Sequence, residues 1–192
     1  MDNSTDDKLS EYCQKRNFTH TKEPIPETKI EYKRPLYVIQ KHAATNLHYD
    51  LRLEIDGILK SWVIPKGPSL DSQIKRMAVL TEDHPLAYAT FEGLIPKDEY
   101  GGGTVIVWDI GTYRNIQSEK EPPVSMDSAF KQGKIEVYLE GKKLKGKFAL
   151  IRINQNWLFF KMKDNYIQTN DILNNEPKSA ISGLDIDQIG TS

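Results

Sequence analysis

The chain has 192 residues, of which 38% are hydrophobic and 28% charged, and its formal net charge is −1. This length and composition predict one globular domain with some tail, in a cytoplasmic protein that we expect to be a monomer. The sequence contains no run of about 18 apolar residues, no secretory signal pattern and only one cysteine, Cys13, which excludes a membrane-spanning helix, a Cys-rich zinc site and an internal disulfide.

Residues 1–34 are polar, include Pro24 and Pro26, and show neither helical nor strand periodicity. We expect them to form an extended N-terminal arm that becomes ordered only by packing on another part of the molecule. Residues 1–11 are predicted to be flexible, and the domain itself is predicted to span residues 12–165.

Short β-rich segments follow from Leu36 onward and are separated by breaks rich in glycine and proline. The Asp56-Gly57 pair between two of these segments is typical of a two-residue β-hairpin turn. One short helix is predicted around Ser125–Lys131. The predicted strands are 36–40, 47–55, 58–64, 75–81, 104–108, 134–139, 147–153 and 157–162. This pattern indicates an all-β barrel or sandwich, followed by a loosely ordered C-terminal tail over residues 166–192.

The predicted strand 47–55 carries the most informative side chains. Alternate residues of an extended strand share a face. His48, Asp50 and Arg52 therefore lie on one side, and the apolar residues between them form a core face on the other. The polar side presents an imidazole, a carboxylate and a guanidinium in a row.

His42 comes shortly before this strand, so two imidazoles and the Asp50 carboxylate form a mixed nitrogen and oxygen ligand set. Such a set suits Mn²⁺, Fe²⁺, Co²⁺ or Zn²⁺ and leaves positions open for water or substrate. The spacing is equally consistent with an ordinary surface row of ion pairs. Both interpretations stay open on the spacing alone.

A second cluster lies around residues 82–88, where His84 and Tyr88 flank Pro85. We place both in a loop just beyond a strand, where active-site groups often gather, although a turn with a capping histidine is an equal alternative. The glycine triplet 101–103 lacks the GK[ST] of a P-loop and is followed by a strand. It therefore indicates a close backbone approach at a barrel corner, and no nucleotide loop.

Positive charge is concentrated between Lys131 and Lys163, a stretch that contains nine Lys and Arg residues and only two acidic residues. Clustered lysines can follow a phosphate backbone. They can also be a solvated edge that protects a hairpin from aggregation. If Lys142, Lys143, Lys145 and Lys147 contact duplex DNA, neutralising them should weaken binding and flatten its salt dependence.

Three stretches resemble one known family closely: YVIQKHAATNLHYDLRLEIDGILKSWVIPKGPSLD, EDHPLAYATFEGLIPKDEYGGGTVIVWD and GKKLKGKFALIRI with WLFFKMKD. They are similar to the 3′-phosphoesterase domain of the bacterial end-joining DNA ligase D, which also occurs as a free-standing protein. The resemblance covers roughly residues 12–166. It implies a compact closed β-barrel with one or two short helices and an Mn²⁺-dependent site, with Co²⁺ or Zn²⁺ as further candidates.

Members of the family remove a 3′-terminal ribonucleoside and then the exposed 3′-phosphate, which leaves a 3′-OH for repair. The resemblance therefore implies a hydrolase that acts on DNA ends in non-homologous end joining, with any ligase or primase-polymerase on a separate chain. The implied metal ligands are His42, His48 and Asp50, and the implied catalytic residues are Arg52, His84 and Tyr88. Supporting or phosphate-binding roles are implied for Arg16, Glu23, Gln40, Lys66, Arg76 and Glu82.

One position departs from the family pattern. The family's Arg-Asp-Phe element appears here as Arg16-Asn17-Phe18. An amide accepts hydrogen bonds but carries no negative charge and cannot act as a base. The balance between the diesterase and monoesterase activities is therefore open, as is the choice between water and a ribose 2′-OH as the attacking group.

Two further interpretations belong to other classes of protein. A non-haem Fe(II) oxygenase would use His48, Asp50 and a distant His84 as its facial triad. A DNA-end-binding accessory module of a ligase would bind ends without turnover. Dependence on a 2-oxo acid and O₂ would indicate the oxygenase, and binding without cleavage would indicate the accessory module.

Overall fold

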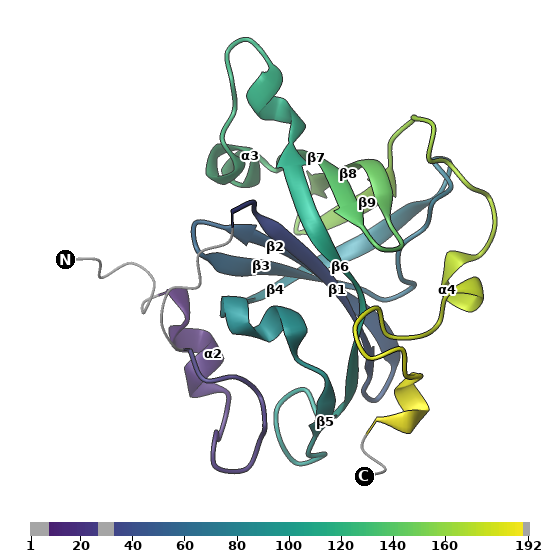
Figure 1. Ribbon diagram of the computed structural model, residues 1–192. Coiled ribbons are helices and arrows are strands. Elements are labelled where there is room, and N and C mark those ends of the chain that lie inside the picture. Colours follow the sequence, from purple (N-terminus) through teal and green to yellow (C-terminus); the bar gives the residue numbers. More distant parts are fainter. Residues whose placement is uncertain (1–7, 27–32, 190–192) are drawn as a thin grey trace.

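The computed structural model describes residues 8–26 and 33–189 and is mainly β, as predicted (Figure 1). Its strands are β1 (Leu36–Ala43), β2 (Leu47–Ile55), β3 (Ile58–Ile64), β4 (Lys75–His84), β5 (Gly93–Ile95), β6 (Gly103–Asn115), β7 (Lys134–Gly141), β8 (Lys145–Ile153) and β9 (Asn156–Lys161). Its helical segments are α2 (Ser10–Gln14), η1 (Leu86–Thr90), η2 (Ile116–Glu119), α3 (Met126–Gln132), α4 (Ile172–Asn175) and η3 (Ile186–Gln188). None of these helices is long and apolar enough to cross a membrane.

The strands form one antiparallel sheet in the order β1-β2-β3-β4-β9-β8-β7-β6-β5. A further pairing between β1 and β6 closes eight of them into a barrel, which confirms the predicted fold class. The short β5 pairs with the beginning of β6, whereas β7 pairs with its end. β2 and β8 consequently lie on opposite sides of the ring of strands.

The β2–β3 hairpin sets the register of the strands that carry the predicted site. Asp56 and Gly57 both have positive φ, 51° and 77°, as a two-residue type I′ turn requires. Ile55 therefore pairs with Ile58, and the ladder continues so that Arg52 lies opposite Ser61.

Strands β1 and β2 are largely buried on both faces, which argues against the alternative of an ordinary surface row of ion pairs. Odd-numbered residues such as Ile39 and Leu51 fill the barrel interior, and even-numbered neighbours such as Val38 pack into a second apolar cluster outside it. The polar residues of β2 lie beside this second cluster. Its buried members are Tyr12, Leu36, Val38, Leu59, Leu86, Tyr88, Ala89, Phe91, Ile95, Val105 and Val107.

The N-terminal arm supplies part of that outer cover. Tyr12 of α2 is fully buried, and its hydroxyl donates a hydrogen bond to the carbonyl of Pro24 at 2.7 Å. The described part of the arm, residues 8–26, thus packs on the barrel. Within the segment 1–11, residues 1–7 lie outside the described residues, whereas Leu9 is buried and α2 already begins at Ser10.

The predicted loosely ordered tail is wrong for residues 166–189, which pack along the barrel. Ile172 of α4 is buried within the barrel's apolar core. The indole N–H of Trp108 donates to the carbonyl of Glu176 at 2.7 Å, and the backbone N–H of Ala180 donates to Val107 O at 2.8 Å. This segment lies across the barrel from the arm in Figure 1.

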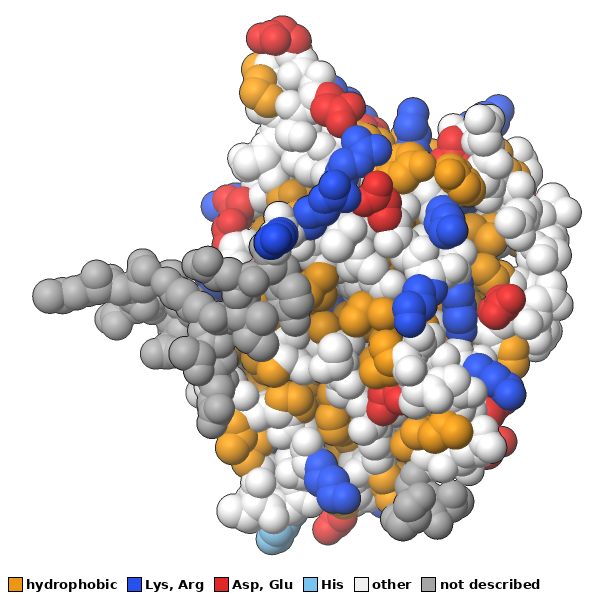
Figure 2. Space-filling model, in the orientation of Figure 1, with side chains coloured by type: hydrophobic (Ala, Val, Ile, Leu, Met, Phe, Trp, Pro, Cys, Tyr) orange, Lys and Arg blue, Asp and Glu red, His pale blue; other side chains and the backbone are white. Residues whose placement is uncertain are grey.

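Part of the basic segment, residues 131–163, is hydrogen-bonded to this C-terminal segment. The ammonium groups of Lys142 and Lys143 donate to the carbonyls of Ala180 and Glu176, at 2.5 and 2.9 Å. On the face drawn in Figure 2, Lys and Arg side chains lie scattered among acidic and apolar ones and do not gather into one patch. These two lysines therefore have structural partners, which favours the structural interpretation at their positions.

Candidate active site

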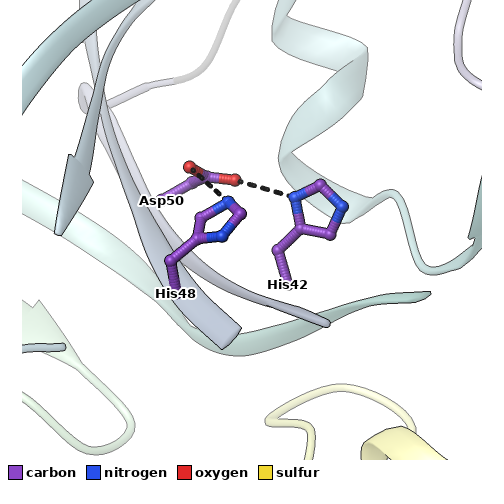
Figure 3. A group of neighbouring side chains, drawn as sticks. All are labelled: His42, His48 and Asp50. Atoms are coloured by element: carbon purple, nitrogen blue, oxygen red, sulfur yellow. Dashed lines mark ion pairs between the residues drawn. The ribbon is translucent and has the colours of Figure 1, made fainter. Parts of the chain in front are cut away.

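Two neighbouring strands bring His42, His48 and Asp50 together at one end of the barrel. His42 lies near the end of β1 and pairs directly with His48 near the start of β2, and their ring centroids are 4.7 Å apart. One ligand atom of each residue lies within 4.8 Å of the others. The three side chains point toward one another in Figure 3.

The carboxylate of Asp50 lies between the two imidazoles. His42 Nδ1 and His48 Nε2 are each 3.7 Å from one of its oxygen atoms. These separations are too long for hydrogen bonds. Two ligands bound about 2.1 Å from one ion lie about 3.0–3.4 Å apart, so small side-chain rotations would let the group hold a divalent ion.

The protonation of these groups also suits a metal. His48 Nδ1 lies 2.9 Å from the carbonyl of Asn46, an arrangement in which Nδ1–H donates and Nε2 keeps its lone pair toward Asp50. The Nε2 atom of His42 is buried without a hydrogen-bond partner. Burial alone would raise the pKa of the Asp50 carboxyl, but Arg52 and the two imidazoles outweigh it, so this pKa lies below its usual range.

Arg52 lies beside the metal group and is 3% exposed. Its Nε donates to Gln40 Oε1 at 2.7 Å, and one terminal nitrogen donates to Ser61 Oγ at 2.9 Å. The same nitrogen lies 2.9 Å from His84 Nδ1, and the other lies 3.4 Å from Asp50. The guanidinium is therefore fixed by partners on β1, β3 and β4, and its second terminal nitrogen makes only the longer contact with Asp50.

A second guanidinium, that of Arg16, approaches His84 from the other side. Its terminal nitrogen lies 3.4 Å from His84 Nε2, and its carbon lies 3.8 Å from the ring centroid of Tyr12. Burial and then the charges of Arg52 and Arg16 lower the pKa of His84 well below its usual range. His84 is consequently a neutral imidazole between two cations.

Carboxylates hold the arm against the barrel at this point. Arg16 donates to Glu23 at 2.9 Å and to Glu82 of β4 at 2.7 Å. The hydroxyl of Tyr88 donates to the same Glu23 oxygen at 2.9 Å. Burial and the Glu23 carboxylate raise the pKa of Tyr88 well above its usual range, so the phenol is a hydrogen-bond donor at neutral pH.

These groups surround a cavity of about 280 Å³. Its lining residues are Arg16, Glu23, His42, Ala44, His48, Asp50, Arg52, Val63, Thr81, Glu82, His84, Tyr88, Ile95, Tyr100 and Gly101. Nine of the twelve site residues that the sequence analysis named therefore line this cavity.

Gln40, Lys66 and Arg76 do not line the cavity. Gln40 is fully buried beneath it, where its amide donates to the carbonyls of Tyr88 and Phe91, both at 3.0 Å. Lys66 is exposed in the turn after β3, and Arg76 lies near the start of β4. Gln40 thus positions other residues, and roles for Lys66 and Arg76 stay predictions.

The sequence analysis placed His84 and Tyr88 in a loop, but neither residue lies in one. His84 is the last residue of β4, which extends three residues beyond the predicted strand, and Tyr88 lies in η1. The facial triad of His48, Asp50 and His84 also lacks support, because the described metal-binding group contains His42 and not His84. His84 is occupied with the two arginines instead.

Asn17 lies outside the cavity and is exposed. Its side-chain oxygen accepts hydrogen bonds from the backbone N–H and the hydroxyl of Thr19, at 3.2 and 2.7 Å. This is a local turn in the arm between Arg16 and Glu23. An amide and a carboxylate can accept these two hydrogen bonds equally well.

Sequence reasoning missed two residues that support the site. Ser61 was detectable, because a two-residue turn at Asp56-Gly57 necessarily pairs position 61 with Arg52. Tyr12 carried no comparable signal, because its contact with His84 joins segments far apart in the sequence.

Comparison with known proteins agrees with this geometry. The family model of the DNA ligase D 3′-phosphoesterase domain matches residues 40–152. The multifunctional non-homologous end joining protein LigD of Pseudomonas aeruginosa is 43% identical over 184 residues, which cover 91% of this chain and 21% of that protein. The corresponding DNA repair protein of Mycobacterium tuberculosis is 42% identical over 160 residues, 82% of this chain and 20% of that protein.

LigD of Mycolicibacterium smegmatis is 44% identical over 162 residues, 82% of this chain and 21% of its own length. The chain thus spans about a fifth of the length of these relatives. The matched region contains the metal group, Arg52, His84 and Tyr88. The chain belongs to the DNA ligase D 3′-phosphoesterase domain family.

Proposed function

We propose that the protein is a metal-dependent phosphoesterase that processes the 3′ ends of DNA in non-homologous end joining. It removes a 3′-terminal ribonucleoside as a phosphodiesterase and a 3′-phosphate as a phosphomonoesterase, and so leaves a 3′-OH. The observation that carries the proposal is the position of Arg52, which is buried and fixed between the metal group and a neutral His84.

The charges around the cavity favour a phosphate ligand. Phosphoryl transfer depends mainly on positioning and on neutralising negative charge. Arg52 offers a fixed guanidinium whose second terminal nitrogen faces the cavity, where its charge would attract a phosphate oxygen. Arg16 places a second guanidinium on the same cavity. The carboxylates of Glu23, Asp50 and Glu82 line the same cavity, so a phosphate there would need the positive charge of a bound metal ion in addition to the two guanidinium groups.

His84 and Tyr88 would act on the oxygen atoms of this phosphate. In the free protein the two arginines keep His84 uncharged. A bound phosphate offsets their charge and raises the proton affinity of His84, which then can hold a proton near the leaving oxygen. Tyr88 donates to Glu23 and orients the arm side of the cavity.

His42, His48 and Asp50 would hold a divalent ion, whose chemistry there would be to neutralise charge on a phosphate oxygen and to activate a nucleophile. Mn²⁺ is our first candidate, with Co²⁺ and Zn²⁺ as alternatives for the same donor set. The donors come from a rigid strand pair, and their positions therefore do not depend on a mobile loop.

The proposal is tested with a 5′-labelled primer-template that ends in one ribonucleotide, incubated with Mn²⁺. A product ending in 3′-phosphate shows the first step, and a 3′-OH product shows both. His48→Ala and Arg52→Ala should each reduce cleavage about 100-fold or more. Lys145→Ala, an exposed change on the opposite strand β8, is the matched control and should cleave normally.

The same experiment separates the other two classes of function. Binding of ends without cleavage in any divalent metal would favour an accessory module. If no cleavage occurs but a 2-oxo acid and O₂ are consumed, the result would favour an oxygenase. Such enzymes also bind their metal through two histidines and one carboxylate. Either outcome overturns the phosphoesterase proposal.

A further inference from the structure

One aromatic side chain at the cavity is exposed to solvent. Tyr100 lies on the loop between β5 and β6, lines the cavity and is 46% exposed. The other two tyrosines of the site, Tyr12 and Tyr88, are 0% and 2% exposed and belong to the outer apolar cluster. Tyr100 therefore presents exposed aromatic surface at the edge of the cavity.

Glycines allow the loop that carries Tyr100 to lie close to the end of β1, the strand that carries His42. A Cβ atom on Gly103 would lie 2.3 Å from the carbonyl oxygen of Ala43, and one on Gly102 would lie 2.6 Å from that of Pro96. A Cβ on Gly101, whose φ is +75°, would contact His42 at 3.9 Å. The glycine triplet thus holds residue 100 beside the metal group, as a close backbone approach predicts.

The N-terminal arm supports the tyrosine ring from one side. The ammonium group of Lys15 lies 4.6 Å from the ring centroid and 3.4 Å from the hydroxyl oxygen. The same group pairs with Glu82 at 2.8 Å, and the guanidinium carbon of Arg16 lies 5.6 Å from the ring centroid. The ring is consequently held in place while almost half of the residue stays open to a ligand.

We propose that Tyr100 is a substrate-positioning residue, on whose ring the nucleobase of the nucleotide that carries the reacting 3′ phosphate stacks. This rests on the proposed function. A base lies one ribose away from its phosphate, and Tyr100 is adjacent to Gly101, which lies against a metal-binding histidine. Every base has an aromatic face, so the contact tolerates any terminal base.

The test uses an oligonucleotide whose last base is 2-aminopurine and whose end is a non-hydrolysable 3′-phosphonate, measured with Mn²⁺ present. Its fluorescence should be quenched on binding to the full chain. Tyr100→Ala should remove the quenching and raise Kd about 10-fold, whereas Tyr100→Phe should keep both near their original values. Tyr166→Ala, an exposed tyrosine that does not line the cavity, is the matched control.

A second oligonucleotide with an abasic terminal nucleotide separates stacking from damage to the fold. Tyr100→Ala should bind it as the unchanged protein does. Equal Kd and equal quenching for the Ala variant and the unchanged protein on 2-aminopurine overturn the role of Tyr100. If that happens while the unchanged protein still cleaves 3′ ends, the proposed function stands. If the unchanged protein neither binds nor cleaves any end, both proposals fall.

Discussion

The imidazole of His84 lies between the guanidinium groups of Arg52 and Arg16, with closest nitrogen distances of 2.9 and 3.4 Å. Neither cation can leave, because Arg52 is bonded to Gln40 and Arg16 to Glu23. Protonating His84 in the free protein would place three positive charges together. The pKa of His84 is therefore low in the folded protein.

This has a consequence for stability. In the unfolded chain a histidine takes up a proton near pH 6.5, whereas folded His84 stays neutral to lower pH. The contribution of neutral His84 to the free energy of unfolding is fully present above about pH 6.5. It is lost as the pH falls below this value, by at most about 1.4 kcal/mol per pH unit. We expect His84→Asn, which keeps an acceptor for Arg52, to lose less stability between pH 7 and pH 5.

Urea unfolding at several pH values measures this difference. The free energy of unfolding of the unchanged protein should fall more steeply below about pH 6.5 than that of the variant. Parallel curves for the two proteins would show that His84 takes up its proton normally in the folded state.

Asn17 permits a second prediction at the level of one residue. Its oxygen only closes a turn in the arm, and it lies outside the cavity. We therefore expect Asn17→Asp to change both cleavage and 3′-phosphate removal by less than about twofold, since a carboxylate accepts the same hydrogen bonds. A large gain in phosphate removal alone, measured on a 3′-phosphate end, would instead assign residue 17 to the chemistry.

Among the elements, the C-terminal segment departs most from its sequence-based prediction. Ile172 of α4 is 7% exposed and belongs to the barrel core. Its replacement by alanine should lower the free energy of unfolding by about 2–3 kcal/mol. Ile181→Ala, at a residue 44% exposed in the same segment, should cost less than about 0.5 kcal/mol. Equal, negligible effects of the two changes in urea unfolding would restore the interpretation of a loose tail.

The strands were predicted well wherever periodicity or a turn signal was local. The Asp56-Gly57 turn and the apolar alternation of β2 gave the hairpin and its register, and Ser125 caps α3 within one residue of the predicted helix. β6 was predicted only over residues 104–108. In the structure Asp109 is buried and accepts a hydrogen bond from Tyr37 at 2.6 Å, and the strand continues.

The candidate site, unlike the strands, was only partly predictable from local patterns. Alternation along β2 placed Asp50 and Arg52 on one face, and the family resemblance added His84 and Tyr88. The cover over that face could not be derived from periodicity, because it is formed by the arm and η1 from distant parts of the chain. This is why the spacing alone left a surface row of ion pairs open as an alternative.

At the scale of the whole molecule, the basic β7–β8 hairpin and the cavity lie on different sides of the barrel. Asp50 and Arg52 are on β2, and β8 is the strand opposite it in the ring. We expect Lys145→Gln combined with Lys147→Gln to leave the salt dependence of DNA-end binding unchanged. Each lost phosphate contact would otherwise flatten the slope by about 0.9, which binding measured across a salt series would reveal.

The double cover of β1 and β2 also limits how this family can change its sequence. Successive residues of these strands face in turn the barrel interior and the outer side, where the second apolar cluster and the cavity lie. Inserting or deleting one residue in either strand would exchange the two sets and send charged groups into the apolar core. Length variation during evolution should therefore be confined to the turns, while these two strands keep a constant number of residues.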